Sequence, residues 1–237
     1  MTGGKWPRAL KMFAPENAPP RFSARVSTAY ARTGLPRTLS SSTADGATIL
    51  LYDEIGYFGV TAADFGAALA KVGDGPLTLR INSPGGDVFD GYAIYNMLCA
   101  RTSPVSVVID GLAASAASFI AMAGETITMA DPSMLMIHNS WAICIGDRNE
   151  MLERAAMQAK VDNQIAGIYA KKCGKSVAAV AQMMDDETWL TSTEALAQKF
   201  CDAIASDPPK ARLEPARAGN RAVTSREWRL RIAEAES

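Results

Sequence analysis

The chain has 237 residues, of which 48% are hydrophobic and 21% charged, with a net charge of −1 at pH 7. This composition is typical of a soluble globular protein with one substantial domain. No stretch approaches the roughly 18 consecutive apolar residues of a membrane span, and no apolar run of signal-peptide length follows the basic N-terminus. A cytoplasmic protein without a membrane partner is therefore expected. The four cysteines are widely spaced and form no CxxC pair, which argues against a disulfide framework or a zinc site.

Charge is distributed unevenly along the chain. Lys and Arg outnumber acids by seven to one in 1–44, are outnumbered ten to twenty in 45–207, and lead by seven to four in 208–237. Both ends are rich in Pro, Ser, Thr and Gly, a composition typical of flexible segments. Basic ends could bind nucleic acid, but solvated tails are the simpler interpretation. The expected parts are a basic, flexible N-terminal extension over 1–45, a folded domain over 46–206 and a basic tail over 207–237.

Strands and helices alternate through the first half of the folded domain. Apolar runs bounded by Gly and Pro predict strands, and apolar residues at three- and four-residue spacing predict helices. Thr61 can cap the first helix and Gly73 can end it. The Ala-rich stretch "GLAASAASFIAM" is predicted as a helix directly after a buried strand. The expected strands are 47–55, 76–83 and 104–111, and the expected helices are 61–73, 88–101 and 111–122.

The second half begins with two short strands, 125–131 and 133–139, and continues into a long helix. Asp147 can cap this helix with Glu150 completing a capping box, and Gly174 can end it after Cys173. A helix of about 26 residues is roughly 40 Å long, more than one small domain can cover. We therefore expect it to contact another subunit. A shorter helix from Ser176 and one capped by Thr191 with Glu194 follow, and the alternating pattern predicts an α/β domain.

Three serines could serve as nucleophiles: Ser115 and Ser118 in the Ala-rich stretch, and Ser140 further along. Nucleophilic serine catalysis requires an imidazole to accept the hydroxyl proton and an acid to orient that imidazole. His138 is the only histidine in the sequence, so a serine–histidine mechanism within one subunit must use it. A metal site built on histidines is nearly excluded for the same reason. Each of these residues taken singly is more often structural than catalytic.

The sequence also contains candidates for stabilising a negatively charged intermediate. A serine at a helix start precedes N–H groups that have no partner within the helix. Gly85 and Gly86 in "SPGGD", at the end of another strand, would let a second N–H approach closely. The acids in "MMDDETW" could orient the histidine or simply face solvent.

Four ordered motifs together resemble the Clp-type serine peptidases. They are "INSPGGDVFDGYAIYNML", "VSVVIDGLAASAASFIAMAG", "MLMIHNSW" and "DDETWLTSTEALAQKFCDAI", and the resemblance spans roughly residues 48 to 204. It implies the fold that these peptidases share with crotonases, a spiral of repeated β-β-α units with a long oligomerisation helix. It also implies a homo-oligomeric ring of six or seven subunits, a protein or peptide substrate, and no cofactor or metal.

The same resemblance assigns the site residues. The family serine closes a G-x-A-A-S motif, which selects Ser115, and the histidine closes M-I-H, which is His138. The oxyanion donors fall on the N–H groups of Gly86 and Ala116. Ungapped counting from Gly174 places Glu187 where the family carries an Asp, so Glu187 is the expected acid.

Asp186 is the alternative for the triad acid. Val88, Phe89, Met122 and Trp141 could shape substrate specificity, although positions in the core are the more ordinary interpretation of these side chains.

The motifs "ILLYDEIG", "SPGGDVFDGYAIYN", "GLAASAAS" and "DETW" look most like the Clp-related head-maturation (prohead) proteases of tailed phages and prophages. This likeness implies processing of capsid or scaffold proteins, in the host cytoplasm or inside the prohead. It makes dependence on an ATPase partner doubtful. The alternatives are a general protein-degrading peptidase of the Clp type, a catalytically silent structural ring, and a crotonase-like acyl-CoA enzyme that would not need Ser115 and His138 together.

Overall fold

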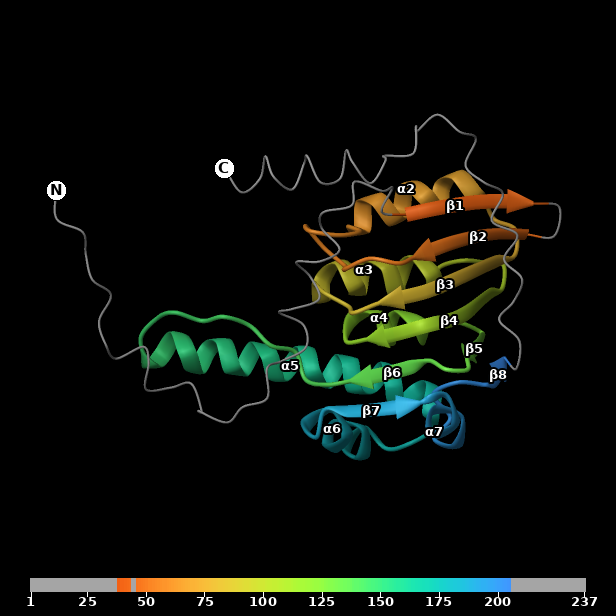
Figure 1. Cartoon of the computed structure of the whole chain (residues 1–237). Helices are drawn as coiled ribbons and strands as arrows, with labels where there is room; N and C mark the ends of the chain where they lie inside the picture. The colour runs from red at the N-terminus through yellow and green to blue at the C-terminus, as the bar shows by residue number, and fades with distance from the viewer. Residues whose placement is uncertain (1–37, 44–45, 206–237) are drawn as a thin grey trace, which may run out of the picture.

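The computed structural model describes residues 38–43 and 46–205. An eight-stranded, mostly parallel sheet forms the centre, with the order β1-β2-β3-β4-β5-β8, while β6 pairs with β4 and β7 (Figure 1). The expected α/β class is confirmed. The strands are β1 (Thr38–Thr43), β2 (Gly46–Leu51), β3 (Leu77–Ser83), β4 (Val105–Ala114), β5 (Thr126–Ala130), β6 (Met134–Ile137), β7 (Thr188–Thr191) and β8 (Ala203–Ala205).

Most of the two expected extensions lies outside the residues that the structure describes. Residues 1–37 and 206–237 lie outside the described residues, and with them almost all of both expected extensions. Strand β1 falls within the segment expected to be an extension, and it pairs antiparallel with β2, from Thr38 opposite Leu51 to Thr43 opposite Gly46. The sheet therefore begins before the expected domain boundary.

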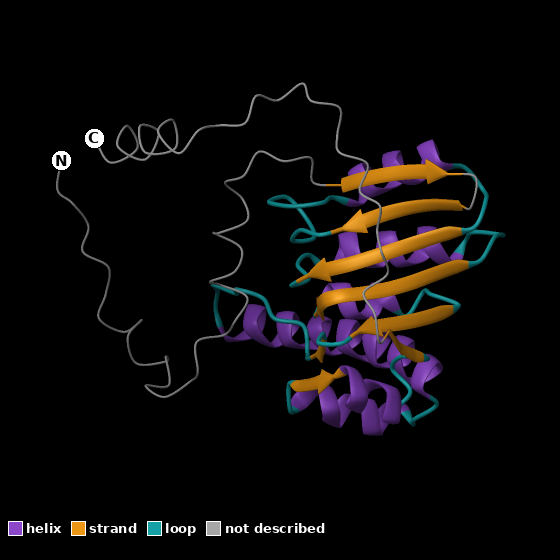
Figure 2. Cartoon of the chain, turned by 45° about the vertical axis from the view of Figure 1, so that its right-hand side comes forward, coloured by secondary structure: helices purple, strands orange, loops and turns teal. Residues whose placement is uncertain are grey.

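Three helices cover one face of the sheet: α2 (Ala62–Val72), α3 (Val88–Cys99) and α4 (Ala116–Ala121) (Figures 1 and 2). Side chains along β3 alternate between buried and half-buried, as expected for a strand with one face against helices. Burial of a Leu or Ile side chain stabilises the fold by about 1.5–3 kcal/mol. The inner face of β2, β3 and β4 supplies a row of such residues with almost no exposed surface, namely Ile49, Leu51, Leu79, Ile81, Val107 and Ile109.

The prediction of a helix over residues 111–122 was wrong for its first part. Strand β4 continues through Ala114, and α4 begins only at Ala116. The first half of β4 pairs with β5, whereas its last residues pair with β6, from Leu112 opposite Met134 to Ala114 opposite Met136. Pairing with a second strand outweighs the helix propensity of alanine, because propensity is a weak preference beside tertiary contacts.

The first predicted strand also ends earlier than expected. It stops at Leu51 rather than Ile55, and the chain then turns tightly through Gly56 and Gly59. Ile55 instead forms isolated bridges to Val60 and Gly86. This turn brings residues 53–58 beside the loop that follows β3.

The predicted long helix is α5 (Arg148–Cys173), and its ends are those expected from local capping. The Asp147 carboxylate accepts hydrogen bonds from the N–H groups of Asn149 and Glu150, and Gly174 ends the helix with φ of 73°. The C-terminal half packs in the core, whereas the N-terminal half extends beyond the sheet (Figure 1). Helices α6 (Val177–Asp185) and α7 (Ser192–Ala197) flank β7. Within the described ranges, no helix combines the length and apolarity needed to cross a membrane.

Candidate active site

Ser115 occupies the sharp turn between β4 and α4. Its backbone has φ of 54° and ψ of −123°, a combination that costs a non-glycine residue about 1–3 kcal/mol and is concentrated at functional sites. The turn is held by a hydrogen bond of 3.0 Å from the Ser115 N–H to the Met136 carbonyl and by one of 3.0 Å from the Ser118 N–H to the Ser115 carbonyl. This geometry lets the hydroxyl reach the cavity described below.

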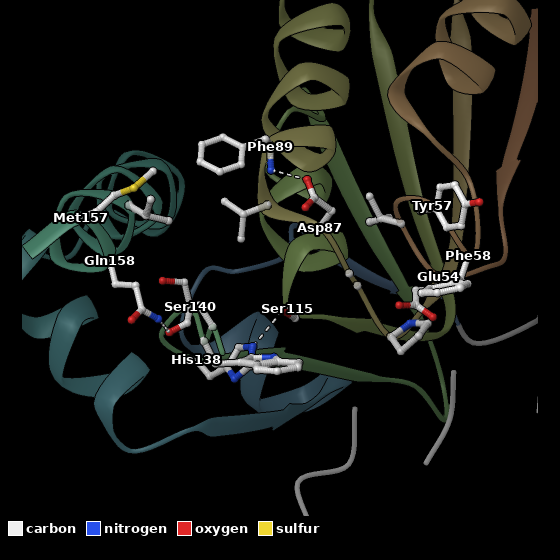
Figure 3. A pocket seen from close by; sticks show the side chains of 18 of the residues that line it. Glu54, Tyr57, Phe58, Asp87, Phe89, Ser115, His138, Ser140, Met157 and Gln158 are labelled. Atoms are coloured by element: carbon white, nitrogen blue, oxygen red, sulfur yellow. Dashed lines mark hydrogen bonds between the residues drawn. The ribbon is translucent and has the colours of Figure 1, made fainter. Parts of the chain in front are cut away.

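His138 directly follows β6, the strand that pairs with the end of β4. This pairing places the imidazole beside the strand-to-helix turn, and His138 Nε2 lies 2.8 Å from Ser115 Oγ (Figure 3). The distance is within hydrogen-bond reach for proton transfer between a nucleophile and a general base. The structure thus brings together the two side chains that the sequence singled out.

Ser118, the competing serine of the Ala-rich stretch, is fully buried. Its hydroxyl lies 2.7 Å from each of three oxygens, namely the carbonyls of Ser115 and Met136 and the hydroxyl of Tyr169. Ser118 therefore ties α4 to β6 and to α5. It holds the turn that presents Ser115 and does not itself face the cavity.

Replacing Ser118 with Ala is expected to destabilise the fold by about 2–3 kcal/mol, because the buried Tyr169 hydroxyl loses this partner. Urea unfolding followed by fluorescence would measure the change in the free energy of unfolding. Ser106→Ala is the matched control, since the Ser106 hydroxyl makes an exposed bond to Thr126 and its loss should cost less than about 0.5 kcal/mol. Equal stability of the two variants would show that the buried network contributes little.

The glycine turn after β3 lies directly against Ser115. A Cβ on Gly85 would come within 2.5 Å of the Ala114 carbonyl oxygen and 2.7 Å of the Ala116 nitrogen. Ile55 donates to the Gly85 carbonyl and accepts from the Asp87 N–H, both at 2.8 Å. Because these two bonds hold the groups on either side of Gly86, the N–H of Gly86 itself is directed away from Ile55. The N–H of Ala116, at the first turn of α4, has no partner within the helix.

We expect Gly86→Ala to lower kcat by about 100-fold or more and to reduce thermal stability. Gly86 has φ of 149°, and a Cβ there would lie 1.9 Å from the Ile55 carbonyl oxygen, so the turn and its N–H must move. Peptide hydrolysis and thermal unfolding of the purified variant would be measured together. Gly75→Ala serves as the control, because a Cβ on Gly75 meets nothing within 4 Å. A Gly86→Ala variant with full activity would remove the turn from the site.

The acids of "DDETW" lie at the junction of α6 and β7. Strands β6 and β7 are antiparallel with Ile137 opposite Thr188, so the next residues along this register are His138 and Glu187. Glu187 has φ of 49°, and its carboxylate accepts a hydrogen bond of 3.3 Å from Trp189 Nε1.

The two aspartates have other partners. Asp186 accepts from the Gln182 amide at 3.1 Å, and Asp185 accepts from the Asn139 amide at 2.6 Å. Asp185 thus anchors the residue next to His138, a contact that the sequence did not indicate.

A cavity of about 590 Å³ opens over the serine–histidine pair. Residues from four regions line it: the turn after β2, the glycine turn with the start of α3, the segment after His138, and one side of α5 (Figure 3). Val88, Phe89 and Trp141 are among its lining residues. Phe89 and Trp141 are 58% and 50% exposed, so the interpretation of these two side chains as core residues was wrong. Val88 is partly buried against the core. Met122 is 7% exposed and packs in the core, so the interpretation as a core residue was correct for this side chain.

Several lining residues were not found from the sequence. They include Glu54, Tyr57, Phe58, Met157 and Gln158. The only available signal for the first three was a "DEIGYFG" turn placed directly after a strand. Nothing in the long helix marks Met157 or Gln158, because their position depends on how α5 crosses the segment after His138. There the Gln158 amide donates to the Ser140 carbonyl at 3.1 Å, and Asp162 accepts from the Ser140 N–H at 2.7 Å.

The donor groups needed for a metal site are not assembled in the part of the chain that the structure describes, where no cluster of three His, Cys, Asp or Glu side chains could hold a metal ion. All four cysteines are free thiols. Cys173 and Cys201 are buried, whereas Cys99 is exposed. Burial, with the nearby Asp202 charge, raises the pKa of Cys201 to about 11, so this thiol is neutral at physiological pH.

A serine on a strand-to-helix turn, an adjacent histidine and a neighbouring glycine turn on an α/β scaffold form an arrangement that is typical of serine hydrolases. The family model described as "Clp protease" matches residues 59–208, more than half of the chain. The chain belongs to the Clp protease family. The expected family is thereby confirmed.

Individual relatives agree with this assignment. ATP-dependent Clp protease proteolytic subunit 1 of Protochlamydia amoebophila is 35% identical over 133 residues, which cover 54% of this chain and 65% of that protein. The corresponding Chlorella vulgaris subunit is 32% identical, over 55% of this chain and 66% of its own length. The chain thus spans about two thirds of these relatives. A solved ClpP1 variant from Listeria monocytogenes superposes with a TM-score of 0.60 and 26% identity, over 68% of this chain and 91% of the other, which confirms the ClpP-like fold.

Proposed function

We propose that this protein is an endopeptidase that cleaves peptide bonds through Ser115 and His138. The observation that carries the proposal is the 2.8 Å contact between Ser115 Oγ and His138 Nε2, two residues that line a cavity large enough for a peptide segment. Ser115 Oγ attacks the peptide carbonyl carbon while its proton passes to His138. The N–H groups of Gly86 and Ala116 then stabilise the oxyanion of the tetrahedral intermediate.

The second half of the reaction uses the same groups. Collapse of the intermediate breaks the C–N bond, and His138 returns its proton to the leaving amine. Water then attacks the acyl-enzyme ester, with His138 as the base, and releases the new carboxyl group and the Ser115 hydroxyl.

We propose Glu187 as the acid that orients His138. The β6–β7 register supports it, since it continues from Ile137 and Thr188 to His138 and Glu187. Ungapped counting from Gly174 also favours Glu187 as the counterpart of the family's aspartate, and a small backbone shift can accommodate the longer Glu side chain. Asp186, the alternative, forms a bond within its own helix turn to Gln182.

The active form that we propose is a homo-oligomeric ring of six or seven subunits, in which the projecting half of α5 meets other subunits. Its support is apolar surface exposed in and before this half of the helix. Met151 and Leu152 are 51% and 59% exposed, and Ile143 and Ile145 in the preceding loop are 79% and 91% exposed. Monomeric proteins rarely leave such apolar groups together in solvent. Sedimentation velocity of the purified chain would give the number of subunits.

For the substrate, we propose capsid or scaffold proteins cut during prohead maturation, in the host cytoplasm or the prohead itself. The motifs quoted above support this finer assignment. The named relatives are subunits of ATP-dependent proteases, and this favours a second candidate: general protein degradation with an ATPase partner. The earlier doubt about such a partner has no support among these relatives.

Two measurements test these proposals. The first is labelling of the assembled protein by a fluorophosphonate probe, read by intact mass; a single adduct at Ser115 is expected, and an assembled ring that never reacts would favour the silent structural alternative. The second is digestion of the major capsid and scaffold proteins of the phage or prophage encoding the chain, beside unfolded casein. A few defined fragments without ATP are expected. Degradation of all substrates to short peptides only with a Clp ATPase would favour the second candidate.

A further inference from the structure

Glu54 lines the cavity, but the proposed mechanism does not use it. Its backbone is fixed on both sides: the Glu54 carbonyl accepts from the Val60 N–H at 2.7 Å, and its N–H donates to the Asp53 carboxylate at 2.8 Å. The next residue, Ile55, makes the two hydrogen bonds that flank Gly86. The backbone of Glu54 is therefore fixed in position relative to the glycine turn after β3.

One oxygen of the half-buried Glu54 carboxylate, Oε2, is shielded from solvent and has no hydrogen-bond partner in the described part of the chain. Burial first, and the neighbouring Asp53 charge second, raise the pKa of Glu54 above its usual value. A desolvated carboxylate without a partner is unfavourable, and a cation placed beside it would offset that cost.

Neither of the other charged lining residues, Asp87 and Arg154, pairs with Glu54 in the described part of the chain. The Asp87 carboxylate is occupied as the cap of α3, where it accepts from the N–H groups of Phe89 and Asp90 at 2.9 Å. Arg154 belongs to α5, and no ion pair joins it to Glu54 within the described residues. In Figure 3, Met157 and Gln158 of α5 lie on the opposite side of the cavity from Glu54.

The surroundings of Glu54 suit a long basic side chain. Tyr57 and Phe58 lie beside it and line the same side of the cavity (Figure 3). Their rings are 5.2 Å apart, edge to face, and they are 85% and 63% exposed, so both present open aromatic surface. The methylene groups of a Lys or Arg can pack on such rings while the charged end reaches a carboxylate, and the ring faces also attract the cation.

We propose that Glu54 forms a subsite that recognises a Lys or Arg side chain of the peptide substrate next to the scissile bond. The inference rests on the proposed peptidase function, because it requires a peptide in this cavity. It goes further in naming a residue that determines specificity. The same chemistry would also bind a free peptide α-ammonium group, and the test separates the two sources.

The test uses quenched fluorescent peptides that differ at one position, with Lys, norleucine or Glu placed in turn from three residues before to three residues after the cleaved bond. For the wild-type oligomer, one position is expected at which the N-acetylated Lys peptide has a kcat/KM at least about tenfold above that of norleucine. In Glu54→Gln this ratio should fall to about one, and in Glu54→Lys the Glu peptide should be preferred. Asp74→Asn, which removes an exposed carboxylate that is not part of the cavity lining, should keep the wild-type ratio.

Equal ratios in wild type and Glu54→Gln would overturn the inference. A preference that appears only with a free N-terminus would show that the site takes the α-ammonium group instead of a side chain.

Binding of the same acetylated peptides to Ser115→Ala, measured by fluorescence anisotropy, keeps the test independent of catalysis. A Lys preference in binding that depends on Glu54, without hydrolysis by the wild type, would sustain the subsite and reject the peptidase. Hydrolysis without any Lys preference would support the peptidase and reject the subsite.

Discussion

Replacing Ser115 with Ala is expected to lower kcat/KM for peptide hydrolysis by on the order of 10⁴- to 10⁶-fold. The variant lacks the hydroxyl that lies 2.8 Å from His138 Nε2, so no acyl-enzyme can form and no proton can pass from the nucleophile to the histidine. The remaining activity would come from the oxyanion donors and substrate binding alone. Hydrolysis of a quenched fluorescent peptide, with active sites counted by the fluorophosphonate probe, would measure the loss.

The control for this variant is Ser106→Ala, which removes an exposed hydroxyl from the same strand, β4. It should retain wild-type labelling and turnover. Thermal unfolding should show that Ser115→Ala remains folded, since alanine keeps the Cβ and the substitution removes only the hydroxyl with its bond to His138. Turnover of thioesters that survives in Ser115→Ala would contradict the peptidase mechanism and would favour crotonase-like chemistry.

The second large effect is expected from Glu187→Gln, which should lower kcat by on the order of 10³- to 10⁴-fold with little change in KM. Gln keeps the size of the side chain but removes the charge that stabilises the imidazolium form of His138 in the transition state. Steady-state hydrolysis across pH would measure both parameters. The loss should be greatest in kcat, because the interaction strengthens only as His138 becomes charged.

The adjacent aspartates provide matched controls for the acid. Asp186→Asn should change kcat by less than about threefold, since its carboxylate bonds to Gln182 within the same helix end. Asp185→Asn tests a third position, because Asp185 holds Asn139 next to the histidine. A 10³-fold loss in Asp186→Asn with an active Glu187→Gln would transfer the role of the acid to the alternative. A large loss confined to Asp185→Asn would assign it to a residue that neither expectation named.

The sequence by itself determined the features whose causes are local. Capping residues act on N–H groups two or three positions away, so Asp147 with Glu150 and Gly174 defined both ends of the 26-residue helix α5. Apolar runs defined the inner strands in the same way. The single histidine left no other imidazole for a serine mechanism within one chain, and the resemblance to the Clp-type peptidases favoured Ser115 over Ser118.

Only the tertiary structure decided features that depend on partners far apart in the chain. Residues 111–114 are a strand because β6 lies beside them, and no local property of Gly-Leu-Ala-Ala indicates that neighbour. Phe89 lines the cavity while Met122 is buried, although both are apolar residues within helical segments. The buried, unpartnered Oε2 atom of Glu54 results from the tight turn that packs residues 53–58 against the glycine loop after β3. Burial and pairing are properties of the assembled elements, whereas capping and hydrophobic periodicity are properties of the chain itself.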